Sequence, residues 1–161
     1  MADKKIYPII MNKNFHKVCL FDDYISLIWT PRYYSPGDFE LCLPINQKSL
    51  QYIKKDYYIL RDDDENVGII QNIQYTNDQF GNEMMIVRGK FLAGILERRI
   101  VETQTSFNNT PVSGAIWRLL NDAIIDPDVE ARKIENFKWH AYTTEETITQ
   151  QITGKNLCSA R

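Results

Sequence analysis

Clustered carboxylates are the first candidates for chemistry in this chain of 161 residues, because they can bind calcium. The acidic run 62–66 (DDDEN) has the composition of the start of a calcium-binding loop. Such a loop needs Gly at its sixth position and Glu at its twelfth. Counted from Asp62, those positions hold Val67 and Ile73. The run therefore indicates a solvated turn, and we expect no metal site.

Other catalytic side chains are sparse. His16 and His140 are the only histidines, and neither lies in a hydrolase or metal-binding motif. No pair of carboxylates stands out, and the seven glycines form no phosphate-binding loop. Arg98 and Arg99 could bind an anion, but cations at the C-terminal end of a short helix also interact well with its dipole. The sequence thus predicts a protein that is not an enzyme and binds no cofactor.

Residues 29–44, WTPRYYSPGDFELCLP, gather aromatic and charged side chains around one Pro-Gly turn. Trp29, Tyr33 and Tyr34 could stack on sugars or bases. They could equally fill the corner of a barrel, with Arg32 covering an aromatic face. The physics of the residues favours the structural role.

Composition limits the partners. Nineteen basic and 21 acidic residues give a formal charge of −2, with both signs mixed along the chain. Nucleic-acid binders usually carry a basic stripe, so we expect no nucleic-acid binding. Cys19, Cys42 and Cys158 have no zinc spacing and indicate reduced thiols, the first two buried in strands. The sequence contains no signal peptide and no membrane-spanning run.

Short apolar or alternating runs bounded by turn residues predict a β-rich first half. We expect strands over residues 18–21, 24–30, 38–44, 57–61, 67–76 and 83–89, and one helical turn at 49–53. The first two strands are expected to pair as a hairpin across Asp22–Asp23, and the last two across residues 77–82.

The signals change after residue 90. Thr110 as N-cap and Pro111 as first helical residue predict the start of a helix. The expected elements are a short helix over 91–100, a strand over 100–105, the helix that ends at Asp126–Pro127, an extended run over 134–141, and a strand or helix over 144–152.

Six short strands with tight turns predict a mainly β, α+β protein that forms a small barrel or a sandwich, and we favour a barrel with a short helix. Closure would remove the exposed edges of the sheet. A small, helix-containing α/β lobe follows the barrel. We place the boundary between residues 1–105 and 106–161.

The stretch WTPRYYSPGDFELCLP is followed by further motifs in a fixed order. A GII strand lies at 68–70, then a polar turn, then VRGKFLAGILERRI at 87–100. With Pro127, residues 132–134 and TGKNL at 153–157, these motifs resemble the Gp37-like proteins of siphoviruses and prophages. The likeness spans nearly the whole chain, and the first and third motifs are the most specific.

The resemblance implies a structural protein of the tail baseplate hub, near the tail tip. It implies a six-stranded β-barrel like those of tail-tube proteins at residues 1–105, and the start of a second hub domain at 106–161. Such proteins form a ring, commonly a trimer, that continues the tail tube. The expected partners are copies of the chain and other tail proteins, such as the distal tail, tail tube and tape-measure proteins. The expected location is the virion tail, after synthesis in the cytoplasm of a bacterial host.

The resemblance places candidate motif and interface residues at two points of the chain. The turn contributes Trp29, Arg32, Tyr33, Tyr34, Gly37, Phe39 and Glu40. It is implied to be a barrel corner and a ring contact. Arg98 and Arg99, with Ile100, are expected to fix the short helix against the barrel.

Members of the family are expected to be longer, with a second barrel and further C-terminal parts. The resemblance therefore implies that this chain is a fragment, or the product of a truncated gene, that supplies the first barrel. The alternative function is a tail-associated module that binds carbohydrate or hydrolyses the cell wall. The sequence offers stacking aromatic side chains for the first of these and no catalytic pair for the second.

Overall fold

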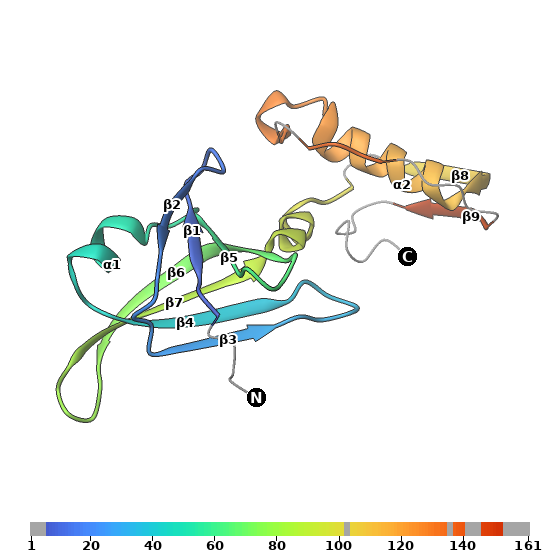
Figure 1. The fold of residues 1–161 in the computed structure, drawn as a ribbon. Coiled ribbons are helices and arrows are strands. Elements are labelled where there is room, and N and C mark those ends of the chain that lie inside the picture. The colour runs from blue at the N-terminus through green and yellow to red at the C-terminus, as the bar shows by residue number, and fades with distance from the viewer. Residues whose placement is uncertain (1–5, 102–103, 135–136, 141–145, 153–161) are drawn as a thin grey trace. The chain divides into compact units, whose positions relative to one another are not determined.

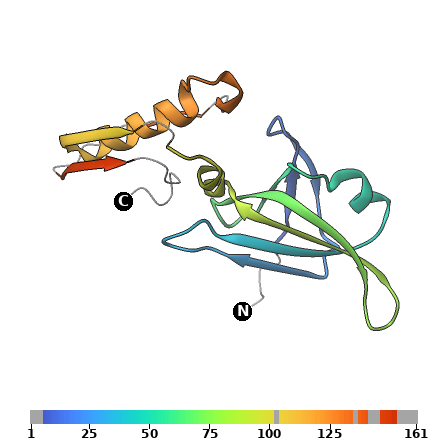
Figure 2. The same cartoon turned by 180° about the vertical axis from the view of Figure 1, so that it is seen from behind.

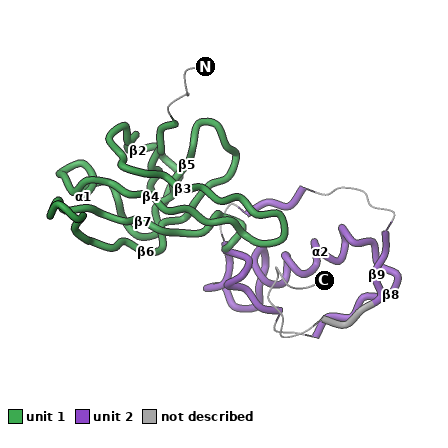
Figure 3. The backbone as a smooth tube through the Cα atoms, turned by 90° about the horizontal axis from the view of Figure 1, so that it is seen from below, with its two compact units in different colours: residues 1–94 green, residues 95–161 purple. Residues whose placement is uncertain are grey.

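The computed structural model describes residues 6–101, 104–134, 137–140 and 146–152. The chain divides into two compact units, residues 1–94 and 95–161 (Figure 3). In its described part, the first unit contains β1 (Ile9–Met11), β2 (Lys17–Leu20), β3 (Ser26–Thr30), β4 (Asp38–Pro44), α1 (Gln47–Tyr52), β5 (Tyr58–Leu60), β6 (Val67–Asn77) and β7 (Glu83–Phe91). The predicted division at residue 105 stays a prediction about domains.

One antiparallel sheet holds all the strands of the first unit, in the order β2-β1-β5-β6-β7-β4-β3 (Figure 1). The predicted β6–β7 hairpin is confirmed. The predicted hairpin between residues 18–21 and 24–30 is wrong, because β2 pairs with β1 and β3 pairs with β4. The sequence did not indicate β1, since three residues between Pro8 and Asn12 are too few to show alternation.

The sheet is open, so the predicted closed barrel of six strands is corrected to an open sheet of seven. β2 and β3 form its two edges, and no backbone ladder between described residues joins them. Yet only residues 21–25 connect these two strands. Six Cα steps reach at most about 20 Å, whereas the edge strands of a flat seven-stranded sheet lie about 29 Å apart. The sheet must therefore curl, and Figures 1 and 2 show β1 and β2 turned across β3, β4 and β7.

The concave side of the curled sheet encloses the core. The buried core residues are Ile10, Phe21, Phe39, Leu41, Leu43, Ile53, Ile59, Ile70, Met85, Val87 and Phe91. Phe21 belongs to the connection between the two edge strands, and its side chain is fully buried. The buried Phe21 side chain therefore fixes the β2–β3 connection to the core.

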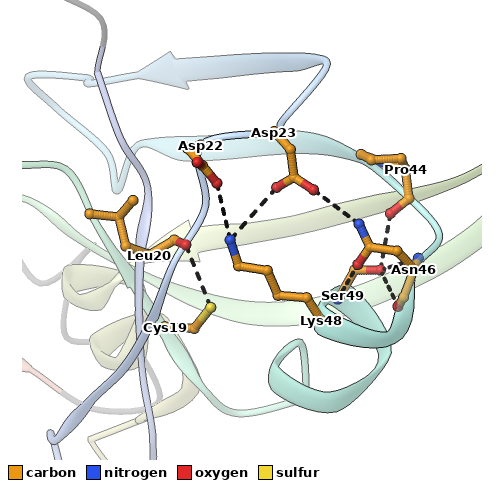
Figure 4. A network of polar contacts seen from close by, with 8 residues as sticks. All are labelled: Cys19, Leu20, Asp22, Asp23, Pro44, Asn46, Lys48 and Ser49. Carbon is orange, nitrogen blue, oxygen red and sulfur yellow. Dashed lines mark hydrogen bonds and ion pairs between the residues drawn. The ribbon is translucent and has the colours of Figure 1, made fainter.

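A polar network holds the same connection from outside (Figure 4). The Lys48 ammonium lies 3.1 Å from Asp22 Oδ1 and 4.0 Å from Asp23 Oδ1. It also lies 5.0 Å from the centre of the Phe21 ring. The Asn46 side chain donates to Asp23 Oδ2 at 2.9 Å. The hydrogen bond to Asp22 raises the pKa of Lys48, so the ammonium keeps its charge.

Helix α1 is held in place by its first turn, because six residues are too few for a stable isolated helix. Asn46 Oδ1 accepts from the Ser49 backbone N–H at 2.8 Å, and Ser49 Oγ accepts from the Asn46 N–H at 2.9 Å. The buried Ser49 hydroxyl lies 3.0 Å from the Pro44 carbonyl oxygen. This capping box ties α1 to the end of β4 and so positions Lys48.

The second unit pairs a helix with a two-stranded sheet. After the 3-10 helix η1 (Leu92–Arg98), its elements are β8 (Thr105–Pro111), α2 (Val112–Leu120), the π-helical turn η2 (Asn121–Ile125), the 3-10 turn η3 (Glu130–Arg132) and β9 (Thr147–Ile152). β8 pairs with β9 in antiparallel orientation. Two small apolar clusters pack here, one around Phe107 and Leu119 and one around Leu120 and Ile124.

Several predictions for the second unit are confirmed and others are wrong. Residues 144–152 were predicted to form a strand or a helix, and residues 147–152 form a strand. Residues 144–145 lie outside the described residues. The predicted helix ends before Asp126, as expected. It begins one residue late, because Thr110 pairs within β8 and Pro111 is the N-cap. The strand predicted over 100–105 begins only at Thr105, and residues 134 and 137–140 form no strand.

Replacing Gly89 by Ala should destabilise the first unit. An added Cβ would lie 1.8 Å from the Ile69 carbonyl oxygen and 2.8 Å from the Phe39 ring. Because the first contact is with backbone, we expect the free energy of unfolding to fall by about 3 kcal/mol. Gly114→Ala is the matched control: its Cβ would meet nothing closer than 3.8 Å. That helical substitution should raise stability by about 1 kcal/mol, and urea unfolding of both variants would test the two opposite signs.

Candidate functional site

Residues 29–40, which run from the end of β3 to the start of β4, contain seven of the nine predicted site residues, and we call them the aromatic turn. Trp29 is partly buried against the core. Its ring centre lies 4.6 Å from that of Phe91 and 5.8 Å from that of Phe39. Trp29 therefore covers one end of the core and is not available as a free stacking platform.

Trp29 also makes a polar contact that the sequence did not indicate. Its indole N–H donates to Asp64 Oδ2 at 3.1 Å, and the Arg61 guanidinium lies 5.6 Å from its ring centre. The contact joins the edge strand β3 to the β5–β6 turn. The sequence suggested that Arg32 covers an aromatic face, but at Trp29 this cation is Arg61. Arg32 instead forms an ion pair with Asp38 at 2.7 Å.

The acidic run 62–66 provides the Asp64 carboxylate that binds Trp29, and its other hydrogen bonds lie within the β5–β6 turn. Asp63 accepts two hydrogen bonds from Arg61, at 2.9 and 2.6 Å. Asp64 Oδ1 accepts from the backbone and the side chain of Asn66, both at 2.7 Å. The Asn66 backbone N–H, helped by the Asn66 and Trp29 side chains, holds the pKa of Asp64 below its ordinary value. These carboxylates thus organise a turn.

Gly37 is required by the close approach of two segments. Its carbonyl accepts from the Phe91 backbone N–H at 2.8 Å. A Cβ at this position would lie 2.3 Å from the Thr30 carbonyl oxygen and 2.5 Å from the Phe91 ring. The Pro-Gly break in the sequence therefore marks a place where β7 packs against the turn.

The two tyrosines of the aromatic turn differ from its other aromatic residues. Tyr33 is 91% exposed and Tyr34 is 77% exposed, and their rings meet edge to face at 4.7 Å. Two adjacent aromatic rings in solvent are unusual unless they meet a partner. These two side chains are therefore the most exposed aromatic residues of the turn.

Phe39 and Glu40 point to opposite faces of the sheet, as neighbours in a strand do. Phe39 is buried in the core. Glu40 lies on the outer face and forms an ion pair with Arg88, whose guanidinium also donates to Gln74 at 3.0 Å. Of this pair only Glu40 belongs to an accessible surface.

Arg98 and Arg99 lie at the end of η1, in the second unit. Arg98 is exposed in the last turn of this 3-10 helix, where a cation complements the helix dipole. Arg99 is half-buried, and its Nε has no hydrogen-bond partner among the described residues. Their predicted role in fixing the short helix stays a prediction.

Reactive groups are not gathered at any of these places. In the described part of the chain, no three His, Cys, Asp or Glu side chains are placed to hold a metal ion. Burial raises the pKa of the Cys19 and Cys42 thiols, which keeps them protonated. No described helix has the length and apolar character to cross a membrane.

Comparison with known proteins gives one family and one shared fold. Residues 7–160 match the family of siphovirus ReqiPepy6 Gp37-like proteins. The motif at 153–157, which contributed to the predicted resemblance, lies in this match but outside the described residues. No curated protein sequence matches the chain.

Among solved structures, the chain resembles the prophage tail protein gp18 from Listeria monocytogenes, with a TM-score of 0.61 and 9% identity. The match covers 95% of this chain and 43% of that protein, so the chain spans less than half of its length. The tail protein from Neisseria meningitidis matches with a TM-score of 0.40 and 15% identity, over 74% of this chain and 31% of that one.

Neutralising Asp64 should change how stability depends on pH. A carboxyl group whose pKa is lowered by folding stabilises the folded state above its unfolded pKa and loses that effect as pH falls. Wild type should therefore lose stability below about pH 4, and Asp64→Asn should show a flatter profile. Urea midpoints at pH 6 and pH 3 would measure this. Glu65→Gln removes a carboxylate from the same turn and should keep the wild-type profile; equal profiles for all three proteins would contradict the assignment.

Proposed function

The chain belongs to the siphovirus ReqiPepy6 Gp37-like protein family, and from this premise we propose that it is a structural, non-enzymatic component of a phage or prophage tail. The observation that carries the proposal is the family match over residues 7–160, joined to a fold shared with a prophage tail protein over 95% of the chain. The tail assignment follows from that relative, which is a prophage tail protein.

Within a tail, we place the chain in the baseplate hub at the tip, as part of a ring of identical chains that continues the tube. A curled sheet whose edge strands pair with no further strand among the described residues supports this placement, since strand edges and exposed aromatic side chains suit contacts between subunits. The proposed partners are further copies, three in the ring, and the neighbouring tail proteins. A tail-tube-like role for residues 1–105 and a second hub domain from residue 106 belong to the same proposal.

The aromatic turn is the proposed contact of the ring. Trp29, Gly37 and Phe39 would act indirectly, because they pack inward and fix the shape of the turn. Tyr33 and Tyr34 would make the contact, since their rings are exposed and large aromatic side chains supply much of the binding energy at protein interfaces.

The proposal predicts where the protein is found. Antibodies against the chain, used as gold labels on purified virions, should mark the distal end of the tail. Labelling that is confined to the capsid, or absent from purified particles, would contradict it. Clearing of cell-wall gels by the purified chain would contradict the non-enzymatic part and favour the alternative of a cell-wall-hydrolysing module.

The tyrosines can be tested in a phage whose own gene is deleted and complemented from a plasmid. Tyr33→Ser/Tyr34→Ser should change the unfolding temperature little, because both side chains are more than three-quarters exposed, but should lower the yield of infectious particles at least about tenfold. Leu50→Ser is the matched control, since Leu50 is 52% exposed on α1 and away from the turn. Full complementation by the double variant would remove the turn from the interface.

A further inference from the structure

The turn between β6 and β7, residues 77–83, presents one aromatic side chain to solvent, and we call it the hairpin tip. The hairpin extends beyond the other strands of the first unit (Figures 1 and 2). Phe80 lies in its turn and is 81% exposed. Asp78 and Glu83 give the tip negative charge. The tip thus combines an apolar anchor with acidic flanks.

Hydrogen bonds to Asp78 fix the shape of the tip. Asp78 Oδ1 accepts from the backbone N–H groups of Phe80 and Asn82, both at 2.8 Å, and Oδ2 accepts from the Asn82 side chain at 2.8 Å. Gly81, at φ 85°, donates to the Asp78 carbonyl at 3.1 Å. The bonds from Asn82 are the main reason that the pKa of Asp78 is lowered. A preformed loop loses little conformational entropy when it binds.

A hollow of opposite charge lies elsewhere on the first unit. It has a volume of about 420 Å³ and is lined by Asn12, Lys13, Asn14, Lys54, Lys55 and Tyr57, which we call the basic hollow. Lys13 pairs with Asp56 at 3.4 Å. Within the described residues, Lys54 and Lys55 have no carboxylate partner. The hollow therefore offers two free cations beside the Tyr57 side chain.

The walls of the basic hollow are also held by backbone contacts. Asn12 Oδ1 accepts from the backbone N–H groups of Asn14 and His16, at 2.9 and 3.0 Å. On the other wall, the Tyr57 N–H donates to the Lys54 carbonyl at 3.2 Å, and the Ile70 N–H donates to the Tyr57 carbonyl at 2.8 Å. Both surfaces are thus formed before any contact between them.

We propose that the hairpin tip of one copy of this chain docks into the basic hollow of a second copy. Phe80 would pack beside Tyr57, with Asp78 and Glu83 facing Lys54 and Lys55. The β1–β2 turn, which forms one wall of the hollow, and the hairpin tip lie at opposite ends of the first unit in both views of the ribbon. One chain therefore cannot make this contact with itself.

Such a contact is head-to-tail, and repeated contacts of this kind close into a ring or extend into a filament. The inference gives the proposed ring a second, chemically defined contact besides the aromatic turn, and it rests on the proposed self-assembly. Its acidic and basic partners also predict that the contact weakens with salt, because the charges are exposed.

Complementation between two variants tests the contact. Phe80→Ser removes the anchor and leaves the hollow intact, whereas Lys54→Glu/Lys55→Glu reverses the hollow and leaves the tip intact. In sedimentation velocity at low salt, wild type should self-associate, and each variant alone should associate at least about tenfold more weakly. A mixture of the two should form heterodimers, because one intact tip can meet one intact hollow.

Two controls match these changes. Leu50→Ser alters an exposed apolar side chain that lines neither surface, and Lys133→Glu/Lys138→Glu reverses two exposed charges in the second unit. Both controls should keep the wild-type association. Circular dichroism spectra equal to wild type would show that each variant is folded.

The outcomes separate this inference from the proposed function. If wild type associates but a variant of the tip or hollow associates equally well, or the mixture gives no heterodimer, the tip-to-hollow contact is overturned and another ring contact is required. If wild type stays monomeric at every concentration, the second-copy assignment is overturned, and the tail location is judged by virion labelling alone.

Discussion

The five residues between β2 and β3 impose the constraint on which the first unit depends. They join the opposite edges of a seven-stranded sheet, so the sheet cannot lie flat. Phe21 in this connection fills the core that the curl encloses, and Lys48 fastens its two aspartates to α1. At the far end of β3, Trp29 reaches Asp64 and Arg61. Side chains thus fasten β3 to the β5–β6 turn, and the β2–β3 connection to α1.

This arrangement explains the composition of the stretch 29–44. Its large residues are divided between two tasks that only the fold separates. Trp29 and Phe39 turn inward, and Gly37 leaves space for the Phe91 ring that packs against Trp29, whereas Tyr33 and Tyr34 remain exposed. In the sequence these residues form one aromatic cluster. Which of them are buried depends on the strand face or turn position that each residue occupies.

The sequence predicted what is local and missed what is distant. The β6–β7 hairpin, the alternation of β4 and the helix after Pro111 follow from short-range patterns, and they are confirmed. The partner of β2 is β1, a run of three residues with no periodicity of its own. The same limit applies to the candidate site. The sequence suggested that the nearby Arg32 covers an aromatic ring, but Arg61, 32 residues after Trp29, lies over the Trp29 ring.

A sheet that curls without closing has a mechanical consequence. In a closed barrel, any change in diameter breaks a row of backbone hydrogen bonds, which resist as one cooperative unit. In this open sheet the curvature can change without breaking a ladder, because no ladder between described residues joins β2 to β3. The contacts of Trp29 with Asp64 and of Lys48 with Asp22 are made by side chains. We therefore expect the first unit to be stiff along its strands and to deform more easily in the direction in which the sheet curls.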